Sequence, residues 1–172
     1  MDVSTLHAAS EDFAAHLSEV TPGDMAQPVH GGGTVSGLVH SVLDETDVLS
    51  AAALRAATAN PPEIDPVSEA EAAIATFGHL PESGYRRAAA VLILALSEVD
   101  ASRFRCRYRV HVCTLVSATH RLAAALGLVV EADEELLHDV RGWADDTATP
   151  AALTDLFDDT VVLLRSGTDA AY

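Results

Sequence analysis

The chain contains no lysine, and all ten of its Lys and Arg residues are arginines. Without lysine, a protein cannot form a Schiff base with a carbonyl substrate, cannot anchor pyridoxal phosphate, and lacks the lysine of a P-loop. Guanidinium groups can still hold a carboxylate or a phosphate through paired hydrogen bonds. The absence therefore excludes several reaction classes but leaves the recognition of small anions open.

Positive charge is scarce as a whole, because 26 acids give a formal net charge of −16. Such a charge argues against DNA, RNA or an anionic membrane surface as a partner. Acids are missing from the window between Asp100 and Glu131, which holds half of the arginines. These arginines are Arg103, Arg105, Arg107, Arg109 and Arg121. The window is therefore expected to form either a central core element or the floor of a site for an anionic ligand.

Cysteines and long apolar runs are also few. Cys106 and Cys113 are the only thiols, and their spacing matches no common zinc motif. Met1–Ala15 lacks the basic start of a secretory signal, and the apolar run Ala88–Leu96 is too short to cross a bilayer. We therefore expect a cytoplasmic protein without a membrane span, whose cysteines are free and mostly buried.

Aromatic residues make up only 5% of the chain, whereas Ala, Leu and Val dominate it, which favours helices. The length of 172 residues and the apolar content of 49% suit a single domain, residues 1–172, with a substantial core. Helical periodicity and turn residues predict helices over residues 6–20, 34–59, 69–77, 81–99, 103–126, 133–144 and 150–165. The predicted fold is an all-α, antiparallel four-helix bundle with additional C-terminal helices.

One segment of this pattern is ambiguous. Arg103–Val112 alternates polar and apolar residues, which is the period of a half-buried strand. Phe104, Tyr108 and Leu115 also recur at helical spacing, and Gly127 is a suitable helix stop. Because no other stretch alternates comparably, a strand here would lack a partner. The pattern therefore favours a helix.

The helix predicted to begin after Thr34 has a clear apolar side, formed by Val35, Leu38, Val42 and Leu49. His40, Asp44 and Asp47 have a spacing that suits metal ligands, but His40 and Asp44 point nearly opposite to the apolar side. A solvated face is therefore the better interpretation for them. Ser41 and Glu45 lie one turn apart near the boundary, where Glu45 can serve as a base or as the partner of an arginine.

The acid-free helix places His111 at the edge of its apolar stripe, beside Arg107 and Thr114. An imidazole can transfer protons near pH 7, and an arginine can hold an anion. The predicted catalytic residues are His111 and Glu45, and the predicted substrate-binding residues are Arg103, Arg107, Tyr108, Thr114 and Ser41. The alternative is a core histidine bonded to a neighbouring carbonyl, with arginines paired to acids of adjacent helices. Cys113 is expected to be a buried, inert thiol.

Two short motifs carry a family resemblance. They are Gln27–Val29 with Thr34–Val42 (QPV and TVSGLVHSV), and Leu122–Gly127 (LAAALG), followed by an acidic helix from Asp133. The motifs resemble the DinB/YfiT-like proteins, in particular the actinobacterial group related to the N-terminal domain of mycothiol-dependent maleylpyruvate isomerase. The resemblance covers about residues 5–145 and implies a four-helix bundle.

The resemblance also bears on metal binding, because many DinB-like proteins hold a divalent metal through a His on the second helix and a Glu or His pair on a later helix. Those positions fall here on Ser41, Thr114 and Ala118, and His120-Arg121 replaces the family's common Trp-Asp. Ser, Thr and Ala do not supply the converging donors that a first-row metal needs. The resemblance therefore implies a member that has lost its metal and needs no cofactor. An alignment shifted by one residue would bring in His40 and retain zinc or nickel.

Together these observations predict a metal-independent, DinB-like protein that binds a small anionic or polar metabolite in its bundle pocket. The predicted chemistry is acid–base: an isomerisation, elimination or cyclisation. Two alternatives stay open. One is a non-catalytic homodimer with a binding or structural role, and the other is a metal- and thiol-dependent isomerase or transferase of the family type.

Overall fold

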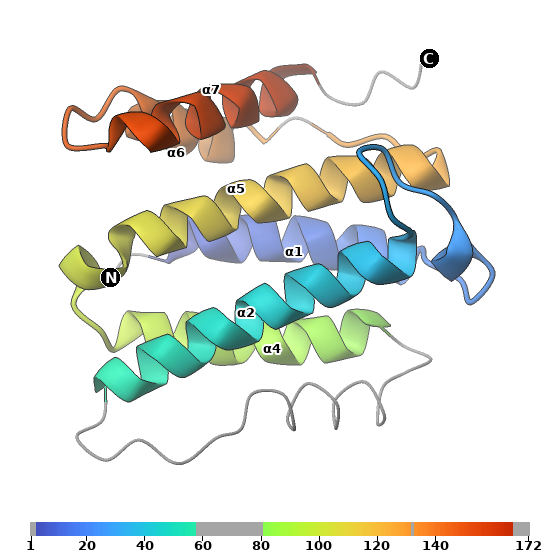
Figure 1. Ribbon diagram of the computed structural model, residues 1–172, viewed down its shortest axis with the longest axis horizontal. Helices are drawn as coiled ribbons and strands as arrows, with labels where there is room; N and C mark the ends of the chain where they lie inside the picture. The colour runs from blue at the N-terminus through green and yellow to red at the C-terminus, as the bar shows by residue number, and fades with distance from the viewer. Residues whose placement is uncertain (1–2, 58–80, 132, 167–172) are drawn as a thin grey trace.

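The computed structural model describes residues 3–57, 81–131 and 133–166, and they fold into helices connected by loops (Figure 1). The helices are α1 (Ser4–Ser18), η1 (Asp24–Ala26), α2 (Val35–Ala57), α4 (Pro81–Ser97), α5 (Ala101–Leu126), α6 (Glu134–Ala144) and α7 (Ala151–Ser166). The prediction of an all-α protein is confirmed for these residues. The helix predicted over residues 69–77 lies outside them. Among the helices described, none combines the length and the hydropathy that a bilayer span requires.

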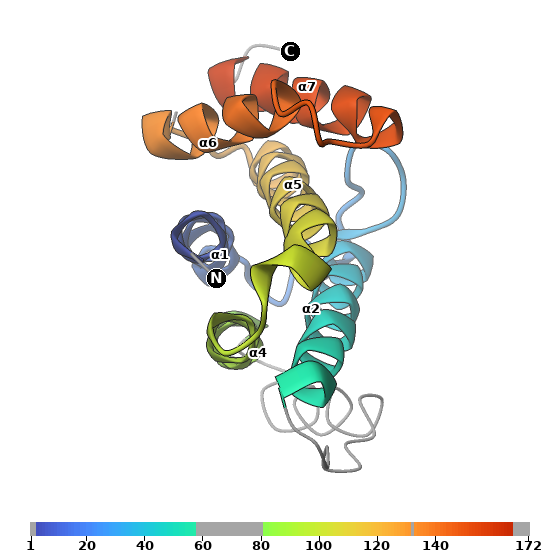
Figure 2. The same ribbon diagram turned by 90° about the vertical axis from the view of Figure 1, so that its left-hand side faces the viewer.

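Four of the helices surround a common core: α1 packs on α4 and α5, and α2 packs on the same two helices from the other side (Figure 2). The chain runs in opposite directions in α1 and α4, and in α2 and α5, whereas α1 and α5 run the same way, as do α2 and α4 (Figure 1). The predicted antiparallel packing therefore holds for only two of the four neighbouring pairs. Short loops produce antiparallel neighbours, and here the long segment 58–80 separates α2 from α4.

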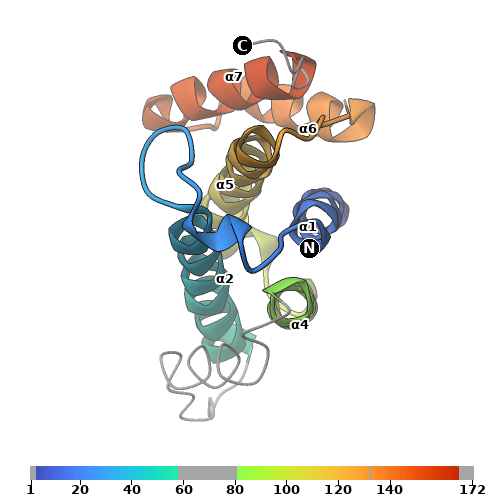
Figure 3. The ribbon, with the colours of Figure 1, turned by 90° about the vertical axis from the view of Figure 1, so that its right-hand side faces the viewer.

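Helix α5 is the central element, because it contacts α1, α2 and α7 (Figures 2 and 3). Its residues Phe104, Tyr108 and Leu115 are buried, so helical spacing decides the conformation of the ambiguous segment. The helix stops at Gly127, which adopts a φ of +68° that favours glycine. The helix interpretation of residues 103–112 is therefore confirmed, and the strand alternative is wrong.

Helices α6 and α7 form a second layer over α5 (Figure 2). The Asp133 side chain caps α6 by accepting hydrogen bonds from the backbone N–H groups of Glu135 and Leu136. A row of edge-to-face aromatic contacts then ties the layers together: Tyr108 to Trp143 at 5.9 Å between ring centroids, and Trp143 to Phe157 at 6.0 Å.

The loop before α2 is held rather than free. Gly31, Gly32 and Gly33 all have positive φ, as glycine permits, and the chain closes through a β-bridge between Pro28 and Thr34. The Arg121 side chain donates hydrogen bonds to the carbonyls of His30 (2.8 Å) and Gly32 (3.1 Å). These two hydrogen bonds anchor the glycine loop to α5. Thr34 accepts from the N–H of Gly37, as expected of a cap.

Candidate functional site

A polar cluster joins α2 to α5 inside the otherwise apolar core. Nδ1 of His111 lies 3.2 Å from Oε1 of Glu45, and the Thr114 hydroxyl lies 3.2 Å from the same oxygen and 3.2 Å from the carbonyl oxygen of Val110, so it shares its one hydrogen between the two. A carboxylate oxygen only accepts, so Nδ1 carries the hydrogen in this contact. His111 is 1% exposed and Glu45 is 37% exposed. The cluster therefore fixes a carboxylate from its buried side while leaving its other side open.

The open side of Glu45 faces a hollow of about 410 Å³ between α2, α5 and α7. It is lined by Glu45, Val48, Leu49, Cys106, Arg107, Val110 and Leu153. This volume falls within the range of small-molecule sites, roughly 300–1,000 Å³. Within the described part of the chain no group is bonded to Oε2 of Glu45. That oxygen is therefore available to a molecule in the hollow, which we call the Glu45 hollow.

Arg107 supplies the opposite charge in the Glu45 hollow. It is exposed, and no carboxylate among residues 3–57, 81–131 and 133–166 forms a salt bridge with it. The remaining walls are mostly apolar, with Val48, Val110 and Leu153 among them. A guanidinium, a carboxylate and apolar walls in one concave surface are typical of a site for a small ligand with a charged end.

The structure separates the other predicted substrate-binding residues from this hollow. Ser41 and Arg103 are exposed on α2 and α5, and neither lines the hollow. Tyr108 is buried on another side of α5, where its hydroxyl accepts a hydrogen bond from the N–H of Leu6 (3.2 Å) and its ring packs on Trp143. Residues one helical turn apart share a face of the helix only approximately. Ser41, Arg103 and Tyr108 therefore do not lie with Glu45 around the hollow.

The geometry also changes the part that His111 can play. The sequence suggested an imidazole facing the ligand, but His111 is fully buried and does not line the Glu45 hollow. Helix α2 packs over this edge of α5 and covers the ring. Glu45, rather than His111, is the acid–base group that a ligand can reach, and His111 holds it in place.

Thr46 is a member of the cluster that the sequence analysis missed. Its hydroxyl donates to the carbonyl of Val42 at 2.7 Å and lies 3.4 Å from Nε2 of His111. Both ring nitrogens of His111 therefore face oxygen atoms of α2. The available signal was a hydroxyl on the buried side of α2, next to Glu45, but serine and threonine commonly bond within their own helix and reveal little alone.

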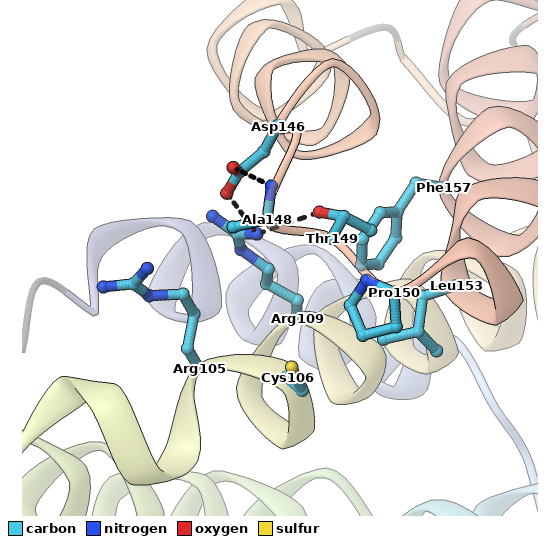
Figure 4. Close-up of a pocket in the computed structure, with 9 residues that line it drawn as sticks. All are labelled: Arg105, Cys106, Arg109, Asp146, Ala148, Thr149, Pro150, Leu153 and Phe157. Carbon is cyan, nitrogen blue, oxygen red and sulfur yellow. Dashed lines mark hydrogen bonds and ion pairs between the residues drawn. The ribbon is translucent and has the colours of Figure 1, made fainter.

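A second cluster of arginines lies on the other flank of the acid-free helix (Figure 4). Arg109 donates to Asp146 (3.0 Å) and Thr149 (3.4 Å) and lies over the Trp143 ring, whereas Arg105 points away from them. The backbone N–H of Ala148 and the Arg109 guanidinium lower the pKa of Asp146. The predicted pairing of arginines with acids of neighbouring helices is confirmed for Arg109, so this cluster joins α5 to the α6–α7 connection.

The two thiols differ in their surroundings. Cys113 is buried as predicted, and burial raises its pKa to about 11, so the reactive thiolate is disfavoured. Cys106 is exposed and lines both the Glu45 hollow and the hollow beside Arg109 (Figure 4), so the expectation of two mostly buried thiols is wrong for Cys106.

Among the described residues, no group of three or more His, Cys, Asp or Glu side chains could hold a metal ion. His40 and Asp44 are exposed on α2, as their position opposite the apolar side of this helix predicted. Of the positions at which the DinB-like resemblance places metal ligands, Thr114 bonds to Glu45 and Ala118 is buried in the core.

The comparisons with known proteins yield no relatives: no family model, no curated protein and no solved structure matches this chain. The site must therefore be interpreted from its own geometry.

Proposed function

We propose that this protein binds a small carboxylate-bearing metabolite in the Glu45 hollow and moves a proton on it through Glu45. The observation that carries the proposal is the arrangement of one carboxylate. Glu45 receives two hydrogen bonds at Oε1 from the interior of the protein, and it lines a hollow that also contains Arg107. A carboxylate oriented in this way can accept a proton at its open oxygen.

The charges of the hollow support an anionic end on the ligand. Arg107 can hold a carboxylate through two parallel hydrogen bonds, as guanidinium groups commonly do. Val48, Val110 and Leu153 then face the hydrocarbon part of the ligand. Glu45 repels a second negative charge, so a monocarboxylate with an apolar body fits better than a dicarboxylate or a phosphate ester.

The proposed chemistry is a proton transfer without a cofactor. Oε2 of Glu45 removes a proton from a carbon next to a carbonyl group, the electron pair moves onto the carbonyl oxygen, and the proton returns at the same or another position. The second outcome is an isomerisation. His111 and Thr114 are positioning residues in this scheme, because they contact Glu45 and not the ligand.

The proposal includes a DinB-like ancestry. The four packed helices and the positions of Thr114 and Ala118 are compatible with a family member whose metal ligands have been replaced. In that case the space near the former metal has become an acid–base site. The homodimer and the metal- and thiol-dependent enzyme remain the competing hypotheses.

Binding is tested by NMR titration with hexanoate, a monocarboxylate with an apolar body. Arg107→Gln should weaken hexanoate binding by about tenfold, since a hydrogen bond to a charged group contributes roughly 1.5–3 kcal/mol. Arg103→Gln is the matched control, because Arg103 is exposed one turn away on α5 but does not line the hollow. Equal effects of the two substitutions would show nonspecific attraction and contradict the proposed site.

Proton transfer is tested by deuterium exchange in D₂O at the carbon next to the carbonyl of 2-oxohexanoate. The native protein should accelerate the exchange, and Glu45→Gln should abolish the acceleration while still binding the probe. If Glu45→Gln exchanges as fast as the native protein, Glu45 is not the base. Binding of hexanoate without any accelerated exchange would support the non-catalytic alternative.

A further inference from the structure

A second hollow, of about 300 Å³, lies between α1 and α4, away from Glu45. Residues that line it include His7, Ser10 and Glu11 from α1, and Tyr85, Arg86 and Leu94 from α4. We call it the Tyr85 hollow. It shares no lining residue with the Glu45 hollow, so it would bind a ligand independently.

The phenol of Tyr85 is the main reason to consider this hollow a site. Tyr85 is only 1% exposed, and its hydroxyl makes no hydrogen bond of good geometry in the described part of the chain, although the Ser10 side chain is close enough to lower its pKa slightly against the larger effect of burial. The ring is held by an edge-to-face contact with Phe13, at 4.9 Å between centroids. Burial raises the pKa of Tyr85, so the phenol stays neutral and keeps its hydrogen. A buried donor without an acceptor is rare and costly, and an oxygen atom of a bound molecule would satisfy it.

The charged side chains at the rim of the Tyr85 hollow indicate which kind of ligand oxygen would accept this hydrogen bond. The Arg86 guanidinium donates to Glu82 at 2.6 Å and to Glu11 at 2.5 Å, so two carboxylates already hold it. The rim therefore carries more negative than positive formal charge. Apart from the His7 imidazole, an anionic ligand would meet no unpaired cationic side chain among the residues that line the hollow, which favours a neutral hydroxyl, carbonyl or amide oxygen as the acceptor.

The remaining wall favours a hydrocarbon chain. Ala89, Ile93 and Leu94 line the hollow along α4, and Leu94 is 67% exposed. A large apolar side chain at the edge of a concave surface gains stability when an apolar molecule covers it. The hollow is thus polar at its buried end, next to Ser10 and Tyr85, and apolar toward solvent.

From these observations we infer that the Tyr85 hollow binds a small, uncharged amphiphile. Its hydroxyl or carbonyl oxygen accepts a hydrogen bond from Tyr85, and its short hydrocarbon chain lies along Ile93 and Leu94. This inference does not depend on the function proposed for the Glu45 hollow.

The experiment is an NMR titration with 1-hexanol, followed on the methyl groups of Ile93 and Leu94. Tyr85→Phe should weaken the binding about three- to tenfold, the loss expected for one hydrogen bond. Tyr108→Phe is the matched control: it also removes a buried hydroxyl, but one that is bonded to Leu6 and lies outside the hollow. Its affinity for 1-hexanol should stay unchanged.

A second pair of variants tests the apolar wall without removing a buried group. Leu94→Ser should weaken 1-hexanol binding, whereas Val162→Ser, at a similarly exposed apolar residue of α7, should not. The inference would be overturned if 1-hexanol caused no saturable change in the NMR chemical shifts, or if the native protein and Tyr85→Phe bound it with equal affinity. The Tyr85 hydroxyl would then be hydrogen-bonded to water. Hexanoate separates the two sites, because its binding should depend on Arg107 and not on Tyr85.

Discussion

Helix α5 carries two buried histidines in different surroundings, His111 facing α2 and His120 near α1. Each lies near a carboxylate of its neighbouring helix, Glu45 for His111 and Asp12 for His120. His111 has an oxygen partner at each ring nitrogen, whereas Nε2 of His120 has no partner among the described residues. Burial beside an acid therefore does not distinguish a site from a core residue.

The two histidines differ in whether the neighbouring carboxylate is already paired with another side chain. Asp12 is occupied by His16, whose Nδ1–H donates to the backbone carbonyl of Asp12 at 2.8 Å and lies 3.4 Å from Oδ1 of its side chain. The pKa of His16 is raised to about 8, first of all by its hydrogen bond with the Asp12 side chain. Among the residues that the structure describes, no cation binds Glu45 on its open side, and Glu45 lines a hollow. The α2–α5 region therefore offers an open carboxylate to a ligand, whereas the carboxylate of the α1–α5 region is already paired with His16.

The largest expected effect is on folding. His111→Leu should reduce the free energy of unfolding by about 2 kcal/mol, because it removes a hydrogen bond to a charged group and leaves Glu45 held only by Thr114. His120→Leu should cost less than about 1 kcal/mol, since Nε2 has no bond to lose. Urea denaturation of both variants measures the difference, and equal losses would erase the distinction between the two histidines.

Lowering the pH should reduce the contribution of His120 to the stability of the fold. Burial lowers the pKa of His120 below its ordinary 6.5, so below that pH the unfolded chain binds a proton that the folded chain resists. The contribution of His120 to stability is therefore lost as the pH falls below about 6.5. His120→Leu should reduce the fall of the urea midpoint between about pH 6.5 and pH 5. If the midpoint falls as much in this variant as in the native protein, other titrating groups cause the fall.

Raising the pH should reduce the contribution of His16 to the stability of the fold. Because its folded-state pKa is about 8, against 6.5 in the unfolded chain, its contribution to stability is complete below pH 6.5 and is lost as the pH rises through 8. His16→Gln should remove the change in the urea midpoint over this interval. His7→Gln is a control on the same helix, since His7 is exposed.

The smallest expected effect concerns two threonines of α5. Thr114→Val removes a hydrogen bond to Glu45 and should reduce the exchange rate of 2-oxohexanoate about threefold, through a less fixed carboxylate. Thr119→Val removes a hydroxyl that donates only to the carbonyl of Leu115, and it should leave the exchange unchanged. Equal rates in the native protein and Thr114→Val would remove Thr114 from the positioning scheme.

Much of the helical layout could be predicted from the sequence, because the signals are local. Apolar spacing identified the buried residues of α2 such as Val42 and Leu49, Gly127 marked the end of α5, and Asp133 was placed at the start of α6. These features depend on one helix and its own backbone, so a single sequence contains them.

The arrangement of the site depended on contacts between helices and was predicted only in part. A helical wheel gives the angle of His111 on α5 but not which helix covers that angle. The burial of His111 agrees with the alternative of a core histidine, but its partner is the Glu45 carboxylate and not the neighbouring carbonyl which that alternative expected. Tyr108 was assigned to the ligand although it bonds to α1. Thr46 was missed because its partner is distant in the chain.

The most direct test of the account is to locate hexanoate on the native protein by intermolecular NMR contacts. The account predicts contacts from the hexanoate chain to the methyl groups of Val48, Val110 and Leu153, all of which line the Glu45 hollow. Contacts to Ile93 and Leu94 alone, or no contacts at saturating hexanoate, would contradict it.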